Sequence, residues 1–242
     1  LKAVIIDFNG VIINEESLHQ ELLEKLLIEE NIRPRPGEYR EVCLGRSDRA
    51  CLRDLLTSRG RALTEEGLDL LVQRKSKYYQ EAIATLKPLP IYVGVEDIIF
   101  RLKSFQLPLA VVSGAVREEI EAVLERTGLA THFSTIVAGD DIPTSKPDPA
   151  GLLLAVERLN QQFPTLEIEP VNCLVIEDSP AGIEAAKHAG MSVVGVANTY
   201  PYHMIQRQAN WTVDRLTELE LDRIKHFFES YSEAELSASA ID

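Results

Sequence analysis

The sequence contains little cysteine, little positive charge and no long apolar run. Its three cysteines, Cys43, Cys51 and Cys173, are an odd number, and their spacing fits no metal-binding motif. Cysteine therefore gives no indication of a metal site. We expect all three side chains to be buried, reduced thiols, which favours a cytoplasmic location.

Positive charge is scarce relative to negative charge. The chain has 25 Lys and Arg against 38 Asp and Glu, which gives a formal net charge of −13 at pH 7. A surface this acidic repels polyanions, so we expect neither nucleic acid nor an anionic membrane among the partners. A site for a phosphorylated ligand would need local cations of its own.

The apolar runs are all far shorter than the roughly 20 residues that a membrane helix needs, so we expect no membrane partner. The chain opens directly into an apolar strand, and we expect no signal peptide. Hydrophobic residues make up 45% of the chain and charged residues 26%, which is ordinary for a soluble globular protein. No exposed apolar stripe is evident, so we expect a monomer.

The order of strand and helix patterns predicts an α/β fold. Short apolar runs typical of buried parallel strands alternate with amphipathic helical patterns over residues 90–230, and one more such run, 3–6, begins the chain. Residues 14–89, between them, have helical patterns throughout. Alternating strands and helices imply a parallel sheet with right-handed crossovers. We predict a core of residues 1–13 and 90–230, a helical insertion at 14–89 and a disordered polar tail at 231–242.

Several reactive side chains stand where predicted strands end or a helix begins. Asp7 and Ser113 each follow a strand, Lys146 precedes a helix, and Glu177 and Asp178 end another strand. Open α/β sheets bind ligands beyond the carboxyl ends of their strands, so we expect these side chains to meet at one site. The carboxylates would repel one another unless a cation lay between them, and Mg²⁺ prefers such oxygen ligands.

These motifs, in this order, resemble those of the haloacid dehalogenase (HAD) superfamily over essentially the whole chain, from Lys2 to about Val213. The sequence of residues 146–149 and 177–182 is most similar to that of the β-phosphoglucomutase-like and CbbY-like branch. The resemblance implies a Rossmann-like parallel core with an inserted α-helical cap domain. It also implies Mg²⁺-dependent phosphoryl transfer from a small phosphorylated metabolite through an aspartyl-phosphate on Asp7.

The resemblance assigns roles to the strand-end residues. Asp7 would be the nucleophile, while Ser113 and Lys146 would bind the phosphoryl oxygens and offset the charge on Asp7. The metal ligands would be Asp7, Asp178, Glu177 directly or through water, and the backbone carbonyl of Asn9. Each of these residues alone has an ordinary structural explanation, and it is the set that indicates a site.

Asn9 departs from the family pattern. The family has Asp at this position, which protonates the leaving oxygen and then activates water or the acceptor hydroxyl. An amide forms hydrogen bonds but does not exchange a proton at neutral pH, and loss of a general acid or base commonly costs about 10²- to 10⁴-fold in rate. Three explanations are open: a weak or non-catalytic family member, proton transfer by another group with His19 as the nearest candidate, or an engineered replacement.

Other residues are candidates for binding substrate. The segment 44–49 resembles the family's cap specificity loop, and a histidine follows the first motif in this branch. Backbone N–H groups at the start of the helix after Ser113 would bind the phosphoryl group, and nearby arginines would contact an anion or simply face solvent. The candidates are His19, Gly45, Arg46, Ser47, Arg49, Gly114, Ala115 and Arg117.

Together these features predict a Mg²⁺-dependent phosphatase, with a non-catalytic phosphometabolite-binding protein as the alternative. A sugar-phosphate mutase is less favoured, because the mutases have a lysine where this chain has Leu44. Metal-free dehalogenases do not need the acids Glu177 and Asp178, and phosphonatases need a cap lysine that no motif identifies here. Both of those branches are also less favoured.

Overall fold

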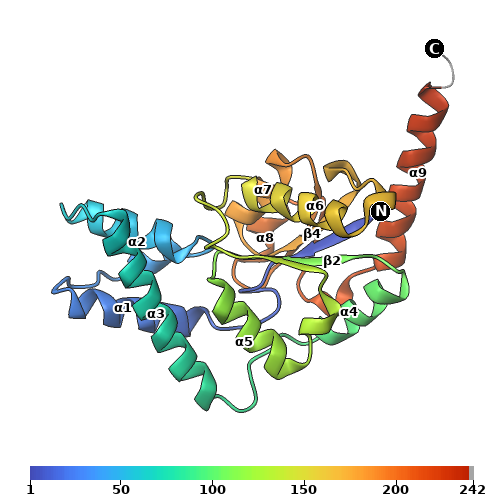
Figure 1. Ribbon diagram of the computed structural model, residues 1–242. Helices are drawn as coiled ribbons and strands as arrows, with labels where there is room; N and C mark the ends of the chain where they lie inside the picture. The colour runs from blue at the N-terminus through green and yellow to red at the C-terminus, as the bar shows by residue number, and fades with distance from the viewer. Residues whose placement is uncertain (240–242) are drawn as a thin grey trace.

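Six parallel strands form the centre of the fold, which confirms the predicted α/β class. The computed structural model describes the backbone of residues 1–239 and the side chains of residues 1–230. The strand order β3-β2-β1-β4-β5-β6 changes direction between β1 and β4, where open α/β sheets bind ligands. Figure 1 labels two of these strands, β2 and β4, among the helices of the core. The strands are Ala3–Ile6 (β1), Leu109–Val112 (β2), Thr135–Val137 (β3), Cys173–Glu177 (β4), Ser192–Val196 (β5) and Trp211–Val213 (β6).

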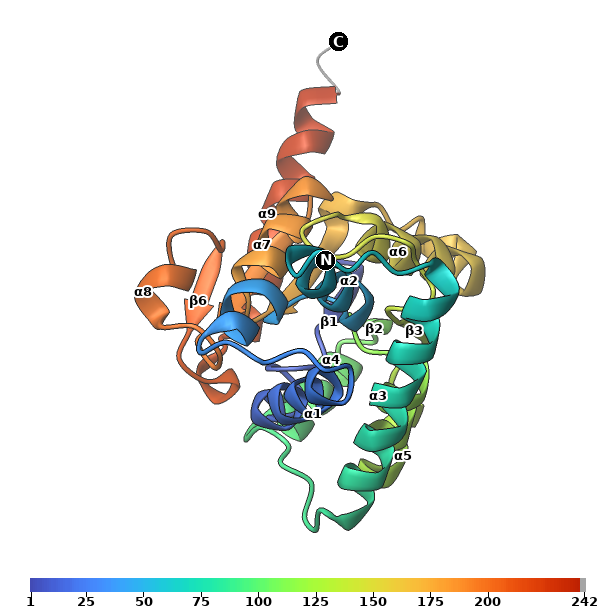
Figure 2. The ribbon, with the colours of Figure 1, turned by 90° about the vertical axis from the view of Figure 1, so that its left-hand side faces the viewer.

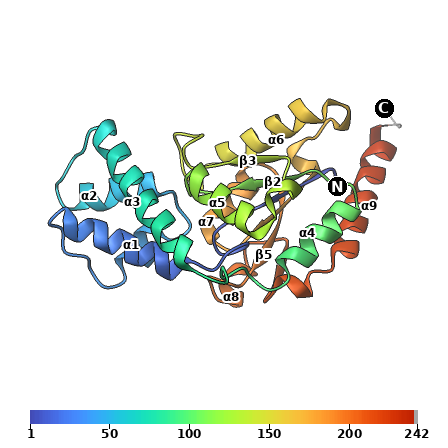
Figure 3. The same ribbon diagram turned by 60° about the horizontal axis from the view of Figure 1, so that its bottom comes forward.

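Helices cover both faces of the sheet. Val4 and Ile6 of β1 pack into one apolar cluster, whereas Ala3 and Ile5 pack into the other, because successive side chains of a strand point to opposite faces. Helices α4, α5 and α9 cover the first face, and α6 and α7 cover the second (Figure 3). Their bounds are Val95–Ser104 (α4), Arg117–Thr127 (α5), Leu221–Ser239 (α9), Ala150–Gln162 (α6) and Pro180–His188 (α7).

A separate group of helices, residues 14–89, lies beyond the carboxyl ends of the strands, and we call it the cap. It has its own apolar cluster, in which Leu26, Leu52 and Leu68 are buried. Ser47 and Thr64 cap two of its helices, each accepting a hydrogen bond from a backbone N–H three residues on. Figure 2 looks from the cap toward the sheet. The cap elements are Glu16–Glu29 (α1), a π-helical turn at Tyr39–Cys43, Asp48–Ser58 (α2) and Glu65–Thr85 (α3).

The end of the chain differs from the prediction. Helix α9 runs to Ser239, into the segment 231–242 for which we expected disorder, and residues 240–242 lie outside the described residues. The segment lacks proline and glycine and contains Ala, Glu and Leu, all good helix formers. The short helix Tyr202–Ile205 (α8) was also not anticipated. No helix in the described part of the chain is long and apolar enough to cross a membrane.

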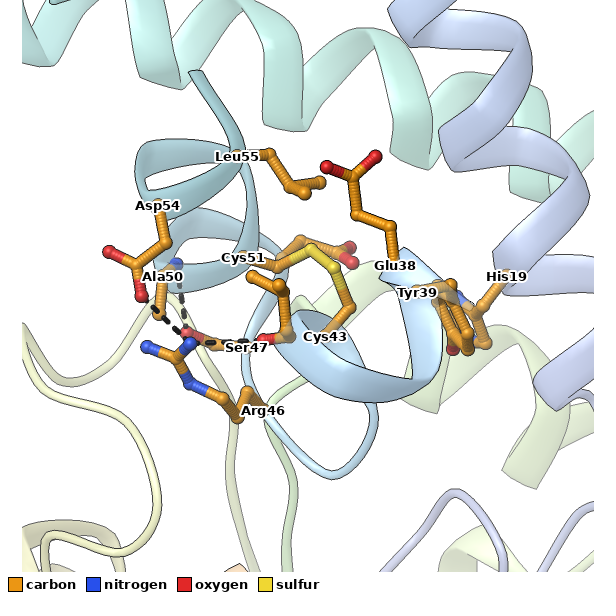
Figure 4. Close-up of a disulfide and its surroundings, with 12 residues drawn as sticks. His19, Glu38, Tyr39, Cys43, Arg46, Ser47, Ala50, Cys51, Asp54 and Leu55 are labelled. Atoms are coloured by element: carbon orange, nitrogen blue, oxygen red, sulfur yellow. Dashed lines mark hydrogen bonds and ion pairs between the residues drawn. A yellow bond between two sulfur atoms is a disulfide. The ribbon is translucent and has the colours of Figure 1, made fainter. Parts of the chain in front are cut away.

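The expectation of three reduced thiols was wrong for two of them. Cys43 and Cys51 form a disulfide, with their Cα atoms 4.8 Å apart, whereas Cys173 is a buried free thiol. The π-helical turn and the first turns of α2 pack into the same cap cluster, and this packing brings the two side chains together (Figure 4). The expected cytoplasmic location loses the support that reduced thiols would have given it.

Candidate active site

Three neighbouring strands bring the predicted acidic and hydroxyl side chains together at one edge of the sheet. The register pairs the last residue of β1 with residues near the ends of both β2 and β4. The side chains that follow are therefore level with one another. Asp7 comes directly after β1, Ser113 follows β2, and Glu177 and Asp178 lie at the end of β4.

Lys146 joins two of these carboxylates. Its Nζ donates a hydrogen bond to Oδ1 of Asp7 at 2.7 Å and also contacts Oε1 of Glu177. Burial opposes charge on the ammonium, but the two carboxylates raise the pKa of Lys146 above its ordinary value. Lys146 is therefore protonated at neutral pH, and it places a positive charge beside the acidic side chains.

Glu177 is fully occupied by hydrogen bonds. Its Oε2 accepts from the backbone N–H of Asp178 at 2.7 Å, from that of Ser179 at 2.8 Å and from the Ser179 hydroxyl at 3.0 Å. Its Oε1 contacts Lys146. Glu177 thus holds the turn after β4 and orients Lys146, and it suits contact with a metal through water better than direct ligation.

The three carboxylates form a cluster that fits a divalent cation. One oxygen from each of Asp7, Glu177 and Asp178 lies within 4.8 Å of the others, and all three residues are buried. Burial raises the pKa of Asp7 to about 7, and burial together with the nearby carboxylates raises the pKa of Asp178 well above its usual value. Lys146 alone therefore does not balance the negative charge, and oxygen donors of this kind suit Mg²⁺.

Gly10 allows the loop after β1 to pass close to this cluster. Its φ of +79° favours glycine, and a Cβ at this position would lie 1.8 Å from Oδ2 of Asp178. Its carbonyl accepts a hydrogen bond of 2.7 Å from Nδ2 of Asn198. Any larger residue would displace the Asp178 carboxylate, which explains the glycine that follows Asn9 in the sequence.

Asn9 lies beside a buried polar network of the cap. Its Nδ2 donates to Oε1 of Glu15 at 3.0 Å, and its amide group lies 2.7 Å from Nε2 of His19. That Nε2 is also 3.1 Å from Oε1 of Glu15, and Nζ of Lys75 lies 2.7 Å from the other ring nitrogen. Tyr79 donates to Oε2 of Glu15 and stacks on the His19 ring. A carboxylate and a histidine are therefore within reach of the amide.

Lys75 connects this network to the core. Its buried Nζ lies 2.6 Å from Oδ2 of Asp48 and 3.9 Å from Oε1 of Glu119 on α5. Neither carboxylate oxygen of Glu119 has a hydrogen-bond partner among the described residues, and burial raises the pKa of Glu119 to about 7. No sequence pattern indicated Glu15, Lys75 or Glu119 as site residues, because charged residues of amphipathic helices usually face solvent.

The backbone after Ser113 is arranged differently from the expected anion site. The Ser113 hydroxyl donates to Oδ1 of Asn9 at 3.3 Å and accepts from the N–H of Ala115 at 3.1 Å. The Ala115 N–H is therefore already paired. Gly114 packs against the cap, since a Cβ there would lie 2.9 Å from Cα of Ser47. Both residues still line the same cavity as Asp7.

The cap loop 44–48 docks on the core at three places. The Ser47 N–H donates to Oγ of Ser145, next to Lys146, at 2.9 Å. Gly45 has a φ of +78°, and a Cβ there would lie 3.0 Å from the Ser179 side chain. Gly114 makes the third contact, with Ser47. This docking closes the cap over the strand ends.

Cap and core together line a cavity of about 50 Å³ that is partly open to solvent. A cavity needs roughly 10–15 Å³ of such volume to hold one water molecule, so this one has room for more than one. Both cysteines of the disulfide, which is drawn in Figure 4, contribute to the wall of the cavity. Of the predicted site residues, those lining it are Asp7, Asn9, His19, Gly45, Arg46, Ser113, Gly114, Ala115, Lys146 and Asp178.

Four other predicted residues do not line this cavity. Glu177 lies behind it, and Ser47 forms the docking contact described above. Arg49 pairs with Glu65 at 2.6 Å within the cap, and Arg117 pairs with Asp141 at 2.6 Å in the core. The two arginines are therefore committed to other carboxylates, at a distance from the strand-end cluster.

Comparisons with known proteins identify the family to which the chain belongs. The family model for haloacid dehalogenase-like hydrolases matches residues 1–190. The validoxylamine A 7'-phosphate phosphatase of Streptomyces hygroscopicus subsp. limoneus is 27% identical over 226 residues, which cover 92% of this chain and 98% of that protein. The β-phosphoglucomutase of Bacillus subtilis is 29% identical, with 96% and 97% of the two chains covered.

Solved structures give the same result. The β-phosphoglucomutase of Clostridium difficile superposes with a TM-score of 0.80 at 25% identity, covering 96% of this chain and 98% of that one. CbbY from Rhodobacter sphaeroides, in complex with phosphate, superposes with a TM-score of 0.78 at 22% identity over 91% of this chain and 96% of its own. This chain belongs to the haloacid dehalogenase-like hydrolase family.

Proposed function

We propose that this protein is a Mg²⁺-dependent phosphatase that acts on a small phosphorylated metabolite. The observation that carries the proposal is the buried Asp7 carboxylate, with Lys146 at 2.7 Å and Asp178 in the same acidic cluster. Two relatives support it: the phosphatase named above and a phosphorylated carbohydrates phosphatase of Thermotoga maritima, 30% identical over 82% of this chain and 87% of that protein.

In the proposed reaction, a carboxylate oxygen of Asp7 attacks phosphorus. A bond to that oxygen forms, the bond to the leaving alcohol breaks, and the alcohol oxygen takes up a proton. Water then attacks phosphorus, releases inorganic phosphate and restores Asp7. Lys146 and Ser113 would stabilise the charge on the phosphoryl oxygens. Bound Mg²⁺, held by Asp7 and Asp178, would add positive charge beside the same oxygens.

The proton for the leaving alcohol must come from a group other than the Asn9 amide. His19 lines the cavity, and its Nε2 faces both Asn9 and the Glu15 carboxylate. Because the Lys75 ammonium can donate to Nδ1 at 2.7 Å, the proton of a neutral His19 ring belongs on Nε2. His19 is thus the residue we propose for proton transfer, with Glu15 as its partner.

Asn9 also favours a second candidate, a non-catalytic protein that binds phosphorylated metabolites on the same scaffold. The two functions differ in turnover. The phosphatase releases phosphate repeatedly, whereas the binding protein holds Mg²⁺ and a phosphorylated ligand without hydrolysing it. All the contacts that would hold the phosphoryl group are the same in both.

The test is phosphate release with Mg²⁺ from an aryl phosphate and a panel of sugar phosphates, using fresh protein and the variants D7N and N9D. Asn9-Gly10 is prone to deamidation, so peptide mass mapping must accompany every sample. Turnover by the unmodified chain that D7N abolishes supports the phosphatase. Turnover by N9D alone supports the binding protein. Turnover that survives D7N contradicts the proposed nucleophile.

A further inference from the structure

The cavity has two chemically different ends. The phosphoryl end holds Asp7, Lys146 and Ser113. If the phosphoryl group lies there, as the proposed function requires, the rest of the ester must lie against the opposite wall. We call that wall the cap end, and its polar side chains are those of Glu16, His19, Tyr39, Arg46 and Asp48.

The cations at the cap end are already neutralised. Arg46 pairs with Oδ2 of Asp54 at 2.8 Å and also donates to the carbonyl of Val42 at 3.0 Å (Figure 4). Lys75, behind the wall, is paired with Asp48 at 2.6 Å. Neither cation is therefore free to meet an anionic group of a substrate.

His19 does not add a net positive charge to the cap end. Its Nδ1 is occupied by Lys75 at 2.7 Å, and its Nε2 lies 3.1 Å from the Glu15 carboxylate. Glu15 is buried behind the ring and neutralises any positive charge that His19 acquires. The ring therefore offers its polar edge to Asn9 and Glu15, and the substrate meets no net positive charge there.

Glu16 leaves the cap end negative. Its Oε2 accepts a hydrogen bond of 2.6 Å from the Tyr39 hydroxyl, and in the described part of the chain no cation lies within ion-pair distance of it. The cap end therefore presents hydrogen-bond acceptors and one unbalanced negative charge.

We propose that the site selects phosphate monoesters whose remaining part is hydroxylated and uncharged, or carries a basic amine, and that it rejects a second anionic group. This inference rests on the proposed function. Hydroxyl and ammonium groups donate to carboxylates such as Glu16, whereas a second phosphate or a carboxylate would face Glu16 without a cation between them. Like charges placed together at a binding surface disfavour the wrong ligand strongly.

A matched series of three phosphate monoesters tests the proposal. Glucosamine 6-phosphate, glucose 6-phosphate and 6-phosphogluconate place an ammonium, hydroxyl groups only, or a carboxylate at the end of the molecule remote from the phosphate. We expect kcat/KM for 6-phosphogluconate to be at least about tenfold below that for glucose 6-phosphate, with glucosamine 6-phosphate equal to or better than glucose 6-phosphate. Fructose 6-phosphate and fructose 1,6-bisphosphate form a second pair, with the bisphosphate disfavoured.

The E16Q variant identifies the cause. The preference is the ratio of kcat/KM for glucose 6-phosphate to kcat/KM for 6-phosphogluconate. Removing the unbalanced charge should reduce this ratio to less than half its value in the unmodified protein, whatever happens to the absolute rates. E21Q, an exposed substitution on the same helix, is the matched control and should leave the ratio unchanged. Equal kcat/KM for the three esters, or a ratio that E16Q does not alter, overturns the inference.

Failure of the proposed function would look different. If no ester is hydrolysed, the same compounds can be ranked by their ability to compete with inorganic phosphate for the Mg²⁺-loaded protein in a calorimetric titration. The inference predicts the same order of affinities there. A reversed or flat order refutes the charge selection, whereas the predicted order without hydrolysis refutes only the phosphatase.

Discussion

Glu119 allows a sharp test of the electrostatics at the interface between cap and core. Its side chain is fully buried on α5, its two oxygens have no hydrogen-bond partner among the described residues, and Nζ of Lys75 lies 3.9 Å away. Burial raises its pKa from 4.5 to about 7, even though the Lys75 charge opposes this, and the nearby Asp48 carboxylate adds to the rise. The folded protein therefore keeps a proton on Glu119 at pH values where the unfolded chain has lost it.

The sign of the effect follows from proton binding. Between pH 4.5 and about 7, unfolding releases the Glu119 proton, so the free energy of unfolding falls as the pH rises. One pH unit corresponds to about 1.4 kcal/mol for a single proton. From about pH 5 to pH 8 the loss from this residue amounts to roughly 2 to 3 kcal/mol, and above pH 7 no further loss is expected.

The E119Q variant lacks this proton. Its stability relative to the unmodified protein should therefore be about 2 to 3 kcal/mol greater at pH 8 than at pH 5, and this difference does not depend on how well the amide packs. Urea unfolding followed by Trp211 fluorescence at both pH values measures it. E118Q, at the exposed neighbouring position, is the control and should show no such dependence. If the difference in unfolding free energy between E119Q and the unmodified protein is the same at the two pH values, the reasoning is refuted.

Two further predictions concern the cysteine thiols and the contact between Asn9 and Glu15. Native protein should not react with a thiol reagent at neutral pH, because Cys173 is buried and burial raises its pKa to about 12. Denatured protein should gain one label in the absence of a reductant and three labels after reduction, as counted by intact mass. Three labels without reductant would exclude the Cys43–Cys51 disulfide. Second, N9D should restore less activity than the double variant N9D/E15Q, since a new carboxylate would face Glu15 at about the 3.0 Å of the present contact. Steady-state kinetics of both variants and of E15Q alone decide this, and a more active single variant would contradict it.

The strand-end cluster could be predicted because its signals are local. Asp7 and Glu177 each end a continuous apolar run, and such runs indicate strands that are buried on both faces. Parallel strands in one sheet must end at one edge, so the sequence order alone was enough to expect that Asp7, Ser113 and Asp178 would meet. The same reasoning predicted the core fold, which the structure confirms.

The network around Asn9 could not be predicted in this way. Glu15, Lys75 and Glu119 come from the start of α1, the middle of α3 and the start of α5. They join His19, which was predicted from the sequence, because α1 packs on α3 and the cap packs on the core. Nothing in the spacing of these residues distinguishes them from the exposed charges of the same helices. The disulfide was missed for a related reason, since it depends on a π-helical turn that no sequence pattern indicated.

The position of Glu15 changes what Asn9 means for activity. An amide at position 9 removes one transferable proton. The buried carboxylate of Glu15 lies 3.0 Å from that amide, however, so an acidic group is still present beside position 9. Glu15 itself does not line the cavity, whereas His19, hydrogen-bonded to it, does. In the proposed phosphatase, turnover would therefore depend on whether a proton can pass through His19 to the leaving oxygen. This route makes two demands on the protein: the His19 ring must keep its proton on the nitrogen that faces Glu15, and the cap must close so that the ring reaches the substrate. Lys75 serves both demands, because its ammonium occupies the other ring nitrogen and also lies 3.9 Å from Glu119 of the core.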